Sequence, residues 1–211
     1  MESASPPSLS SEQVLHGDIP HILEEIFLHL DYECLKTCFE VCSDWRKILK
    51  SVSFQKKAKV VFATEISMDQ EKLVKASYDG NTEMILKLLS TDFLDINHGP
   101  QAPYDYATPL IMAANAGKVD AIEILLDRGA DPNIKHEEDG NTPLHEAAQF
   151  GYGDAMQVLL GKGADPNIKN GIGDTPLSLV LIDNDIPTYR LFRNERRTLG
   201  QILLDAGANV L

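Results

Sequence analysis

The stretch DGNTPLHEAAQFGYGDAMQVLLGKGADPN, residues 139–167, decides the fold because much of its pattern occurs three times in the chain. Thr-Pro-Leu stands at residues 108–110, 142–144 and 175–177, so its threonines are 34 and 33 residues apart. A period of roughly 33 residues is typical of stacked helical repeats. One such unit cannot bury both of its faces, so the sequence predicts an array whose neighbouring units share a core.

The chemistry of the stretch predicts two helices in each unit. Thr142 is a natural N-cap, and Pro143 fits the first helical position, where its missing N–H costs nothing. The small side chains at 147–148 allow neighbouring helices to approach closely. Gly151 and Gly163 can adopt the positive φ that ends a helix, so we expect the two helices to end there.

The pattern TPLH-x-AA followed by LL-xx-GAD-x-N resembles the ankyrin repeat. Residues 139–167 match it closely, 107–133 match it with Ile111 in place of the usual histidine, and 73–97 form a degenerate first copy without TPL. The resemblance implies an all-α solenoid with finger-like turns and a concave face that binds proteins. Ankyrin arrays are very rarely enzymes, so no catalytic residue and no cofactor is expected. The predicted repeats are about 69–98, 99–133, 134–167 and 168–211.

Composition narrows the kinds of partner. The 211 residues carry a net charge of −13 and are 43% hydrophobic. Nucleic acids and anionic membranes are bound chiefly through cationic groups, so neither is an expected partner. A basic protein surface fits better. Because the sequence has no long apolar run and no apolar signal at its start, we expect a cytoplasmic or nuclear protein.

The chain ahead of the array has a different composition. Residues 1–16 are rich in serine and proline and have too few apolar side chains to fold, so we expect a disordered tail. Residues 18–49 carry two helical patterns with many large apolar side chains. A segment this short cannot build a satisfactory core alone, so part of its apolar surface is expected to bind a partner.

This second segment resembles the F-box. It has Ile19-Pro20, then Ile26-Phe27 and Leu30, and it closes with Val41-Cys42-Ser43-Asp44-Trp45. The resemblance assigns residues 17–52 to an F-box module and 53–68 to a connector. It implies binding to the Skp adaptor, and through the adaptor to a cullin/RING ubiquitin ligase. The implied adaptor-binding residues are Ile19, Pro20, Leu23, Ile26, Phe27, Leu30, Leu35, Val41, Cys42 and Trp45.

Two functions follow from these readings. In the first, the chain is the substrate-recognition subunit of a Skp-cullin-F-box ligase, with the repeats binding the protein target. In the second, it is an ankyrin scaffold or sequestering inhibitor without a ligase role, and its amino-terminal helices only cap the stack.

Residues that differ between the repeats are expected to contact the target. Acidic fingers and aromatic side chains indicate a basic, partly apolar segment as the ligand, although the acids could serve only solubility. The expected contacts are Tyr104, Tyr106, Met112, Asn115, His136, Glu137, Glu138, Glu146 and Phe150.

Three cysteines and one histidine are further candidates for a site. Cys34, Cys38 and Cys42 lie four residues apart on a helix, where the outer two are about 12 Å apart, too far to share a zinc ion. They are expected to be buried, and no metal site is expected. His145 is predicted to hold the turns by hydrogen bonds to the backbone rather than to act in catalysis.

Two features remain open. About ten extra residues lie between the two helices of the fourth repeat, within the arginine-rich segment 183–197, which is expected as a loop that either binds or is merely tolerated. Asn133 and Asn167 resemble the sites at which an asparaginyl hydroxylase modifies ankyrin repeats.

Overall fold

The computed structural model describes part of the chain: residues 24, 26–32, 34–36, 50, 54, 57–58, 61–90, 93–100, 107–181 and 193–209. These residues form helices, turns and loops, and none of the described segments is a strand. The predicted all-α fold is therefore confirmed. The predicted tail at 1–16 lies outside the described residues.

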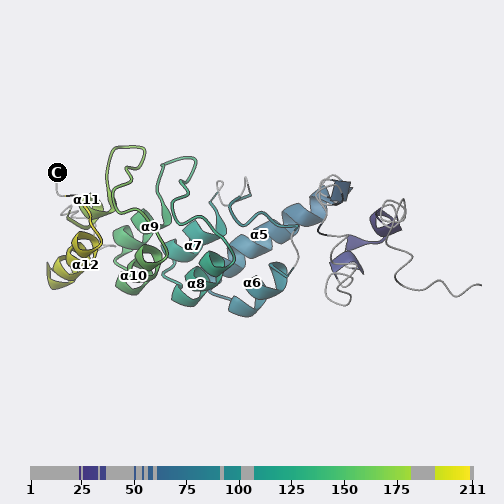
Figure 1. Ribbon diagram of the computed structural model, residues 1–211, viewed down its shortest axis with the longest axis horizontal. Helices are drawn as coiled ribbons and strands as arrows, with labels where there is room; N and C mark the ends of the chain where they lie inside the picture. Colours follow the sequence, from purple (N-terminus) through teal and green to yellow (C-terminus); the bar gives the residue numbers. More distant parts are fainter. Residues whose placement is uncertain are drawn as a thin grey trace, which may run out of the picture. The chain divides into compact units, whose positions relative to one another are not determined.

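The described residues divide into two compact units. The first contains those up to Ile66 together with Ser90 and Phe93, and the second contains 67–89 and the residues from Leu94 onward. The helices, numbered as in Figure 1, have the following bounds: α5 Ala63–Asp79, α6 Thr82–Leu88, α7 Pro109–Asn115, α8 Val119–Asp127, α9 Pro143–Phe150, α10 Gly153–Gly161, α11 Pro176–Leu181 and α12 Arg193–Asp205.

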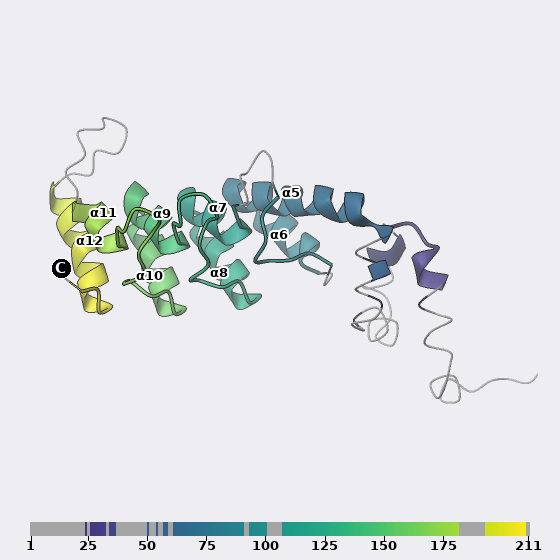
Figure 2. The ribbon, with the colours of Figure 1, turned by 90° about the horizontal axis from the view of Figure 1, so that it is seen from above.

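The second unit is a stack of helix pairs. In Figures 1 and 2 each pair contributes one helix to each of two rows, with α7, α9 and α11 in one row and α8, α10 and α12 in the other. Helix α9 packs against α7 and α11 in its own row and against α10 in the other. The loops that join successive pairs project from the stack as fingers (Figure 1).

Local signals start and end these helices as the sequence predicts. Thr142 has extended backbone, and its hydroxyl accepts a hydrogen bond from the amide of His145. Thr108 caps α7 in the same way through the amide of Ile111. Gly151 ends α9 with a φ of 78°, a left-handed conformation that costs glycine little. The predicted caps and stops are therefore confirmed.

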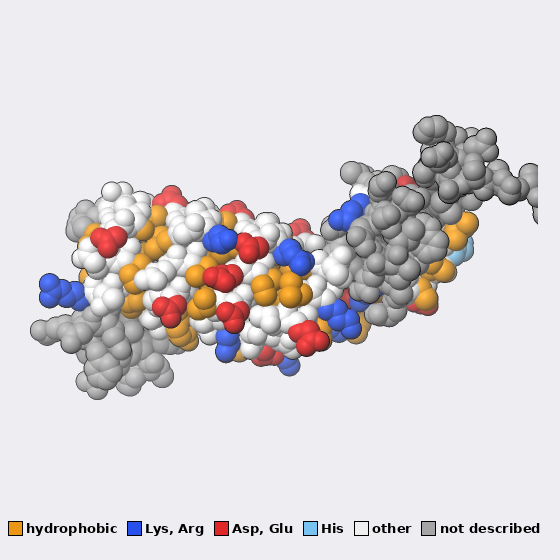
Figure 3. Space-filling model, turned by 60° about the horizontal axis from the view of Figure 1, so that its bottom comes forward, with side chains coloured by type: hydrophobic (Ala, Val, Ile, Leu, Met, Phe, Trp, Pro, Cys, Tyr) orange, Lys and Arg blue, Asp and Glu red, His pale blue; other side chains and the backbone are white. Residues whose placement is uncertain are grey.

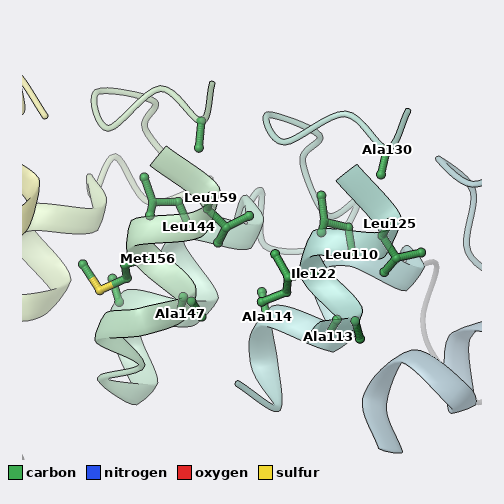
Figure 4. Close-up of a cluster of buried hydrophobic side chains, with 14 of the residues drawn as sticks. Leu110, Ala113, Ala114, Ile122, Leu125, Ala130, Leu144, Ala147, Met156 and Leu159 are labelled. Carbon is green, nitrogen blue, oxygen red and sulfur yellow. The ribbon is translucent and has the colours of Figure 1, made fainter. Parts of the chain in front are cut away.

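Alternating small and large side chains fill the core of the stack. Ala113, Ala114, Ala147 and Ala148 are fully buried, and their small size lets neighbouring helices approach closely. Leucine, isoleucine and methionine side chains from both rows fill the remaining space (Figure 4). This is the shared core that the repeat pattern predicts.

The first repeat lacks Thr-Pro-Leu, and a glutamine side chain holds its loop instead. The side chain of Gln70 in α5 donates hydrogen bonds to the carbonyls of Asp95 and His98, at 2.8 and 2.7 Å. Its oxygen also accepts from the amide of Asp95 at 3.2 Å. Gln70 therefore fixes the loop that follows α6. Helix α5 itself begins at Ala63, inside the segment predicted as a connector.

The amino-terminal unit has a hydrophobic cluster of its own. The rings of Phe27 and Phe54 meet edge to face, with centroids 6.2 Å apart. Phe62 and Phe93 are also buried in this cluster, and both rings lie within 6 Å of the Tyr32 ring, at 5.7 and 5.9 Å between centroids. The unit thus contains an aromatic core built from residues far apart in the sequence.

Two expectations need correction. Cys34 is exposed rather than buried, because its thiol and amide both donate hydrogen bonds to the carboxylate of Asp31 at the helix start; Cys38 and Cys42 lie outside the described residues. The insert at 183–197 is not a loop throughout, since α12 begins at Arg193. The run RNERRTLGQILLD contains many good helix formers, which explains the early start. Residues 182–192 lie outside the described residues.

Candidate protein-binding surface

The finger formed by residues 134–141 carries the acidic group predicted to contact a target. Its turn is closed by two backbone hydrogen bonds, from the His136 amide to the Asn141 carbonyl at 2.8 Å and from the Gly140 amide to the His136 carbonyl at 3.0 Å. The Asp139 carboxylate accepts from the Asn141 amide at 2.9 Å and lies 3.0 Å from the His136 ring. Glu137 and Glu138 are exposed between these fixed points.

A second finger, residues 168–175, is bonded directly to the first. The amide of Gly171 donates to the carbonyl of Asp139 at 2.8 Å, and the ammonium of Lys135 donates to the carbonyl of Lys169 at 2.7 Å. The approach is so close that a Cβ on Gly140 would lie 2.7 Å from the Gly171 nitrogen. The fingers therefore form a joined pair, and beside this link Ile172 is 83% exposed.

His145 joins helix α9 to the second finger. Its Nδ1 accepts from the Thr142 amide at 3.2 Å, and its Nε2 donates to the carbonyl of Asp174 at 3.0 Å. Burial lowers the pKa of His145, opposed by the hydrogen bond to Asp174. A neutral ring with its hydrogen on Nε2 satisfies both contacts. The predicted backbone-bonding role is confirmed.

The structure separates the residues predicted to contact a target. Met112, Asn115, His136 and Phe150 are half-buried, and Tyr104 and Tyr106 lie outside the described residues. Phe150 ends α9, whereas the acidic finger precedes its first residue, so the two lie about 10 Å apart along the axis. The Phe150 ring instead stacks on Tyr152. The acidic finger and Phe150 thus lie at opposite ends of α9.

Glu146 occupies a different environment from the other acids of this surface. Only 8% of the residue is exposed, and its two carboxylate oxygens accept from Asn115 at 2.8 Å and from Asn141 at 2.9 Å. Asn141 in turn accepts from the side chain of Asn170 at 2.9 Å. Sequence reasoning did not find Asn141 or Asn170, because neither belongs to the repeated pattern.

Acidic side chains are not confined to the fingers. On the face in Figure 3, they are spread across the array among hydrophobic side chains, with basic ones between them. Asp120 and Glu123 of α8, for example, are exposed. A test of the fingers must therefore compare a change of their acids with an equal change of charge elsewhere on the array.

Asparagines connect each repeat to the next. Asn133 donates to the carbonyl of Gly163 at 3.1 Å and accepts from the amide of Asp165 at 2.7 Å. Asn167 makes the same two bonds with Gly207 and Asn209, at 3.1 and 2.8 Å. Both predicted modification sites thus already use both polar atoms of their side chains in the stack.

Four of the residues predicted to contact the adaptor are described. Phe27 and Leu35 are buried in the aromatic core, at 4% and 0% exposed, and Leu30 is half-buried. Ile26 is 53% exposed. The other predicted contacts lie outside the described residues: Ile19, Pro20, Leu23, Val41, Cys42 and Trp45.

Comparison with known families identifies the array. Residues 73–170 match the family described as "Ankyrin repeats (3 copies)", and no F-box was detected. This segment therefore consists of ankyrin repeats, which generally bind proteins and are not enzymes. No curated protein matches the chain at a significant level. No helix within the described segments has the length and apolar character needed to cross a membrane.

Proposed function

We propose that this ankyrin protein is the substrate-recognition subunit of a Skp-cullin-F-box ubiquitin ligase. The carrying observation is the Val-Cys-x-x-Trp sequence pattern after Ile19-Pro20 and Ile26-Phe27, in a unit that precedes a protein-binding array. The exposed side chain of Ile26 supports the proposal, because an apolar group left at the surface of a small unit is suited to a partner.

In this role the chain contributes proximity rather than chemistry. The amino-terminal unit binds the Skp adaptor, and the repeats bind the target, so the target's effective concentration near the ligase rises. Ubiquitin transfer takes place on the bound ligase.

The test is adaptor binding by surface variants. Ile26→Asp places a charge on the proposed interface, and Val61→Asp is a matched control because Val61 is 55% exposed in the same unit. We expect Ile26→Asp to weaken co-purification with the Skp adaptor at least tenfold and Val61→Asp to preserve it. Pro20→Ala with Trp45→Ala, checked for folding by circular dichroism, tests the motif itself.

Wild-type protein that fails to bind the adaptor contradicts the ligase role and leaves the scaffold or sequestering inhibitor. Retained binding by folded Ile26→Asp and by folded Pro20→Ala/Trp45→Ala contradicts the assigned interface.

The target segment is proposed to be basic and partly apolar. Exposed Glu137 and Glu138 supply negative charge, and Ile172 on the joined finger supplies an apolar contact. A labelled peptide of lysine and leucine residues serves as the probe. Glu137→Lys with Glu138→Lys should weaken its binding at least tenfold, since the charges would repel.

The matched control reverses Asp120 and Glu123, which makes the same change in net charge on helix α8. Equal weakening by both double variants would mean that net charge, not the finger, attracts the probe. Modification of Asn133 and Asn167 by an asparaginyl hydroxylase is a further proposal, and mass spectrometry of the native protein tests it as a 16 Da gain.

A further inference from the structure

We propose that Glu146 is a positioning residue that holds the 134–141 and 168–175 fingers in a fixed arrangement for the bound segment. The proposal rests on the proposed binding role of these fingers. It concerns the free protein, however, because the hydrogen bonds that carry it need no ligand.

The geometry is a continuous chain of hydrogen bonds across three helix pairs. Asn115 at the end of α7 donates to one oxygen of Glu146 in α9, and Asn141 at the base of the first finger donates to the other. Asn170 of the second finger then donates to Asn141. Asn141 also donates to the Asp139 carboxylate at 3.0 Å. We call these five residues the Glu146 network.

The buried acid at the centre of the network occurs in one repeat, although the array repeats its other parts. The position of Glu146 is taken by Met112 in α7 and by Leu179 in α11, counted from the capping threonine of each repeat. A residue that the stack itself required would recur in each copy. A buried acid in a single copy therefore serves something local, and its bonds run to the two fingers.

Because Glu146 is buried, its carboxylate oxygens need hydrogen-bond donors within the protein. Glu146 and Asn141 are 8% and 7% exposed, so a polar atom left without a partner there is costly. Both carboxylate oxygens can only accept, and both neighbouring amide groups donate to them. A glutamine would turn an N–H₂ group toward one of those donors. Glu146→Gln therefore breaks one link of the network at nearly constant side-chain volume.

The experiment is amide hydrogen exchange on the full chain without any partner. The amides of Gly140 and Gly171 report on the fingers, and those of Ile122 and Met156 report on helices α8 and α10. For Glu146→Gln we expect finger amides to exchange about tenfold faster, because one hydrogen bond is lost and the remaining one is no longer made to a charged group. The helix amides should change less than about twofold by the same reasoning.

Asn133→Ala is the matched control, because it removes two hydrogen bonds outside the network between the second and third repeats, which the bond from Asn115 to Glu146 also joins. It should not accelerate the finger amides more than the helix amides. Asn115→Ala leaves the bond between Glu146 and Asn141 in place, so it should give a smaller acceleration of the fingers, about threefold for a single lost link.

Exchange in Glu146→Gln that is unchanged, or raised equally in fingers and helices, overturns the proposal. If Glu146→Gln does not fold, Asn115→Ala decides the question, and unchanged finger exchange in that variant overturns the proposal. Failure of the chain to bind the adaptor or the lysine-leucine peptide would leave these results untouched, so the two proposals fail separately.

Discussion

The second and third repeats have the same helices but a different residue at the third helical position. In both, a threonine caps the first helix, Thr108 for α7 and Thr142 for α9. The next contact differs, because Ile111 is only buried whereas His145 also bonds to the neighbouring finger. The shared residues build the stack, and the differing ones determine how firmly each finger is held.

The next helix pair, α11 and α12, starts its first helix with a different residue. Ser178 stands at the position of His145, and its hydroxyl accepts from the Thr175 amide at 2.9 Å. The Ser178 amide donates back to the Thr175 hydroxyl at 3.2 Å. The hydrogen bonds of the cap are thus complete. The serine side chain is short, and these bonds stay within the start of the helix. Capping alone does not need histidine; the bond from helix α9 to the neighbouring finger is the one that histidine supplies.

The largest expected effects come from the shared core, where the two repeats should behave alike. Leu110→Ala and Leu144→Ala each remove a side chain that is at most 1% exposed, so each should cost about 3 kcal/mol of unfolding free energy. Urea unfolding followed by circular dichroism measures both. Leu86→Ala, at 41% exposed, is the control and should cost less than about 1 kcal/mol. If Leu144→Ala lost more than twice the unfolding free energy that Leu110→Ala loses, the cores of the two repeats would not be equivalent.

The next effect tests the close approach of the two fingers. Gly140 has a φ of 71° and Gly163 a φ of 97°, so alanine is strained at both. Only Gly140 of the two also meets a neighbour, since a Cβ at Gly163 has nothing within 4 Å. Gly140→Ala should cost about 2 to 3 kcal/mol and Gly163→Ala about 1 kcal/mol in urea unfolding. Equal losses of unfolding free energy in the two variants would show that the fingers can move apart at Gly140 without a free-energy cost.

A smaller effect separates the two caps. Thr142→Ala removes the bond to the His145 amide and the 2.8 Å contact with the His145 ring, and should cost about 2 kcal/mol. Thr108→Ala removes a cap without the ring contact and should cost about 1 kcal/mol. Thermal unfolding compares the two. Thr142→Ser keeps the hydroxyl and should recover most of the loss.

The smallest effect is a pH dependence that only the histidine-bearing repeat should have. The pKa of folded His145 is lowered by burial, so the unfolded chain binds the proton more readily. Stability is therefore complete above the ordinary histidine pKa and falls as the pH drops below it, because protonation then favours the unfolded chain.

His145→Gln is the comparison for this pH dependence, because glutamine does not titrate in this range. Unfolding free energies of both proteins at pH 7.5 and 5.5 measure the difference. The same drop in both would assign the acid sensitivity to other groups.

Repeated local chemistry explains why the stack could be predicted from sequence. Thr142, Pro143 and Gly151 determine the helix bounds through bonds within a few residues, and the same signals recur in the other copies. The first repeat lacks these signals, and its loop depends instead on Gln70, which bonds to residues 25 and 28 positions away. No local pattern marks such a residue.

The candidate site was only partly predictable for the same reason. Glu137 and Glu138 were found because exposed acids in a turn are visible in the sequence. Glu146 was expected to face a ligand, since it lies beside the repeated motif on the inner helix. Its burial depends on Asn115, 31 positions away, and on Asn141, so its role follows only from packing. Conversely, the start of α12 depends on local helix propensity within a segment first expected as a loop.

The asparagine connections have a mechanical consequence. Each of Asn133 and Asn167 makes its two hydrogen bonds with the next repeat side by side, one as donor and one as acceptor. Pulling two repeats apart along this edge must break both bonds together, whereas bending about this edge leaves them in place. We therefore expect bending between neighbouring repeats to take place about this edge, where the asparagine bonds are kept.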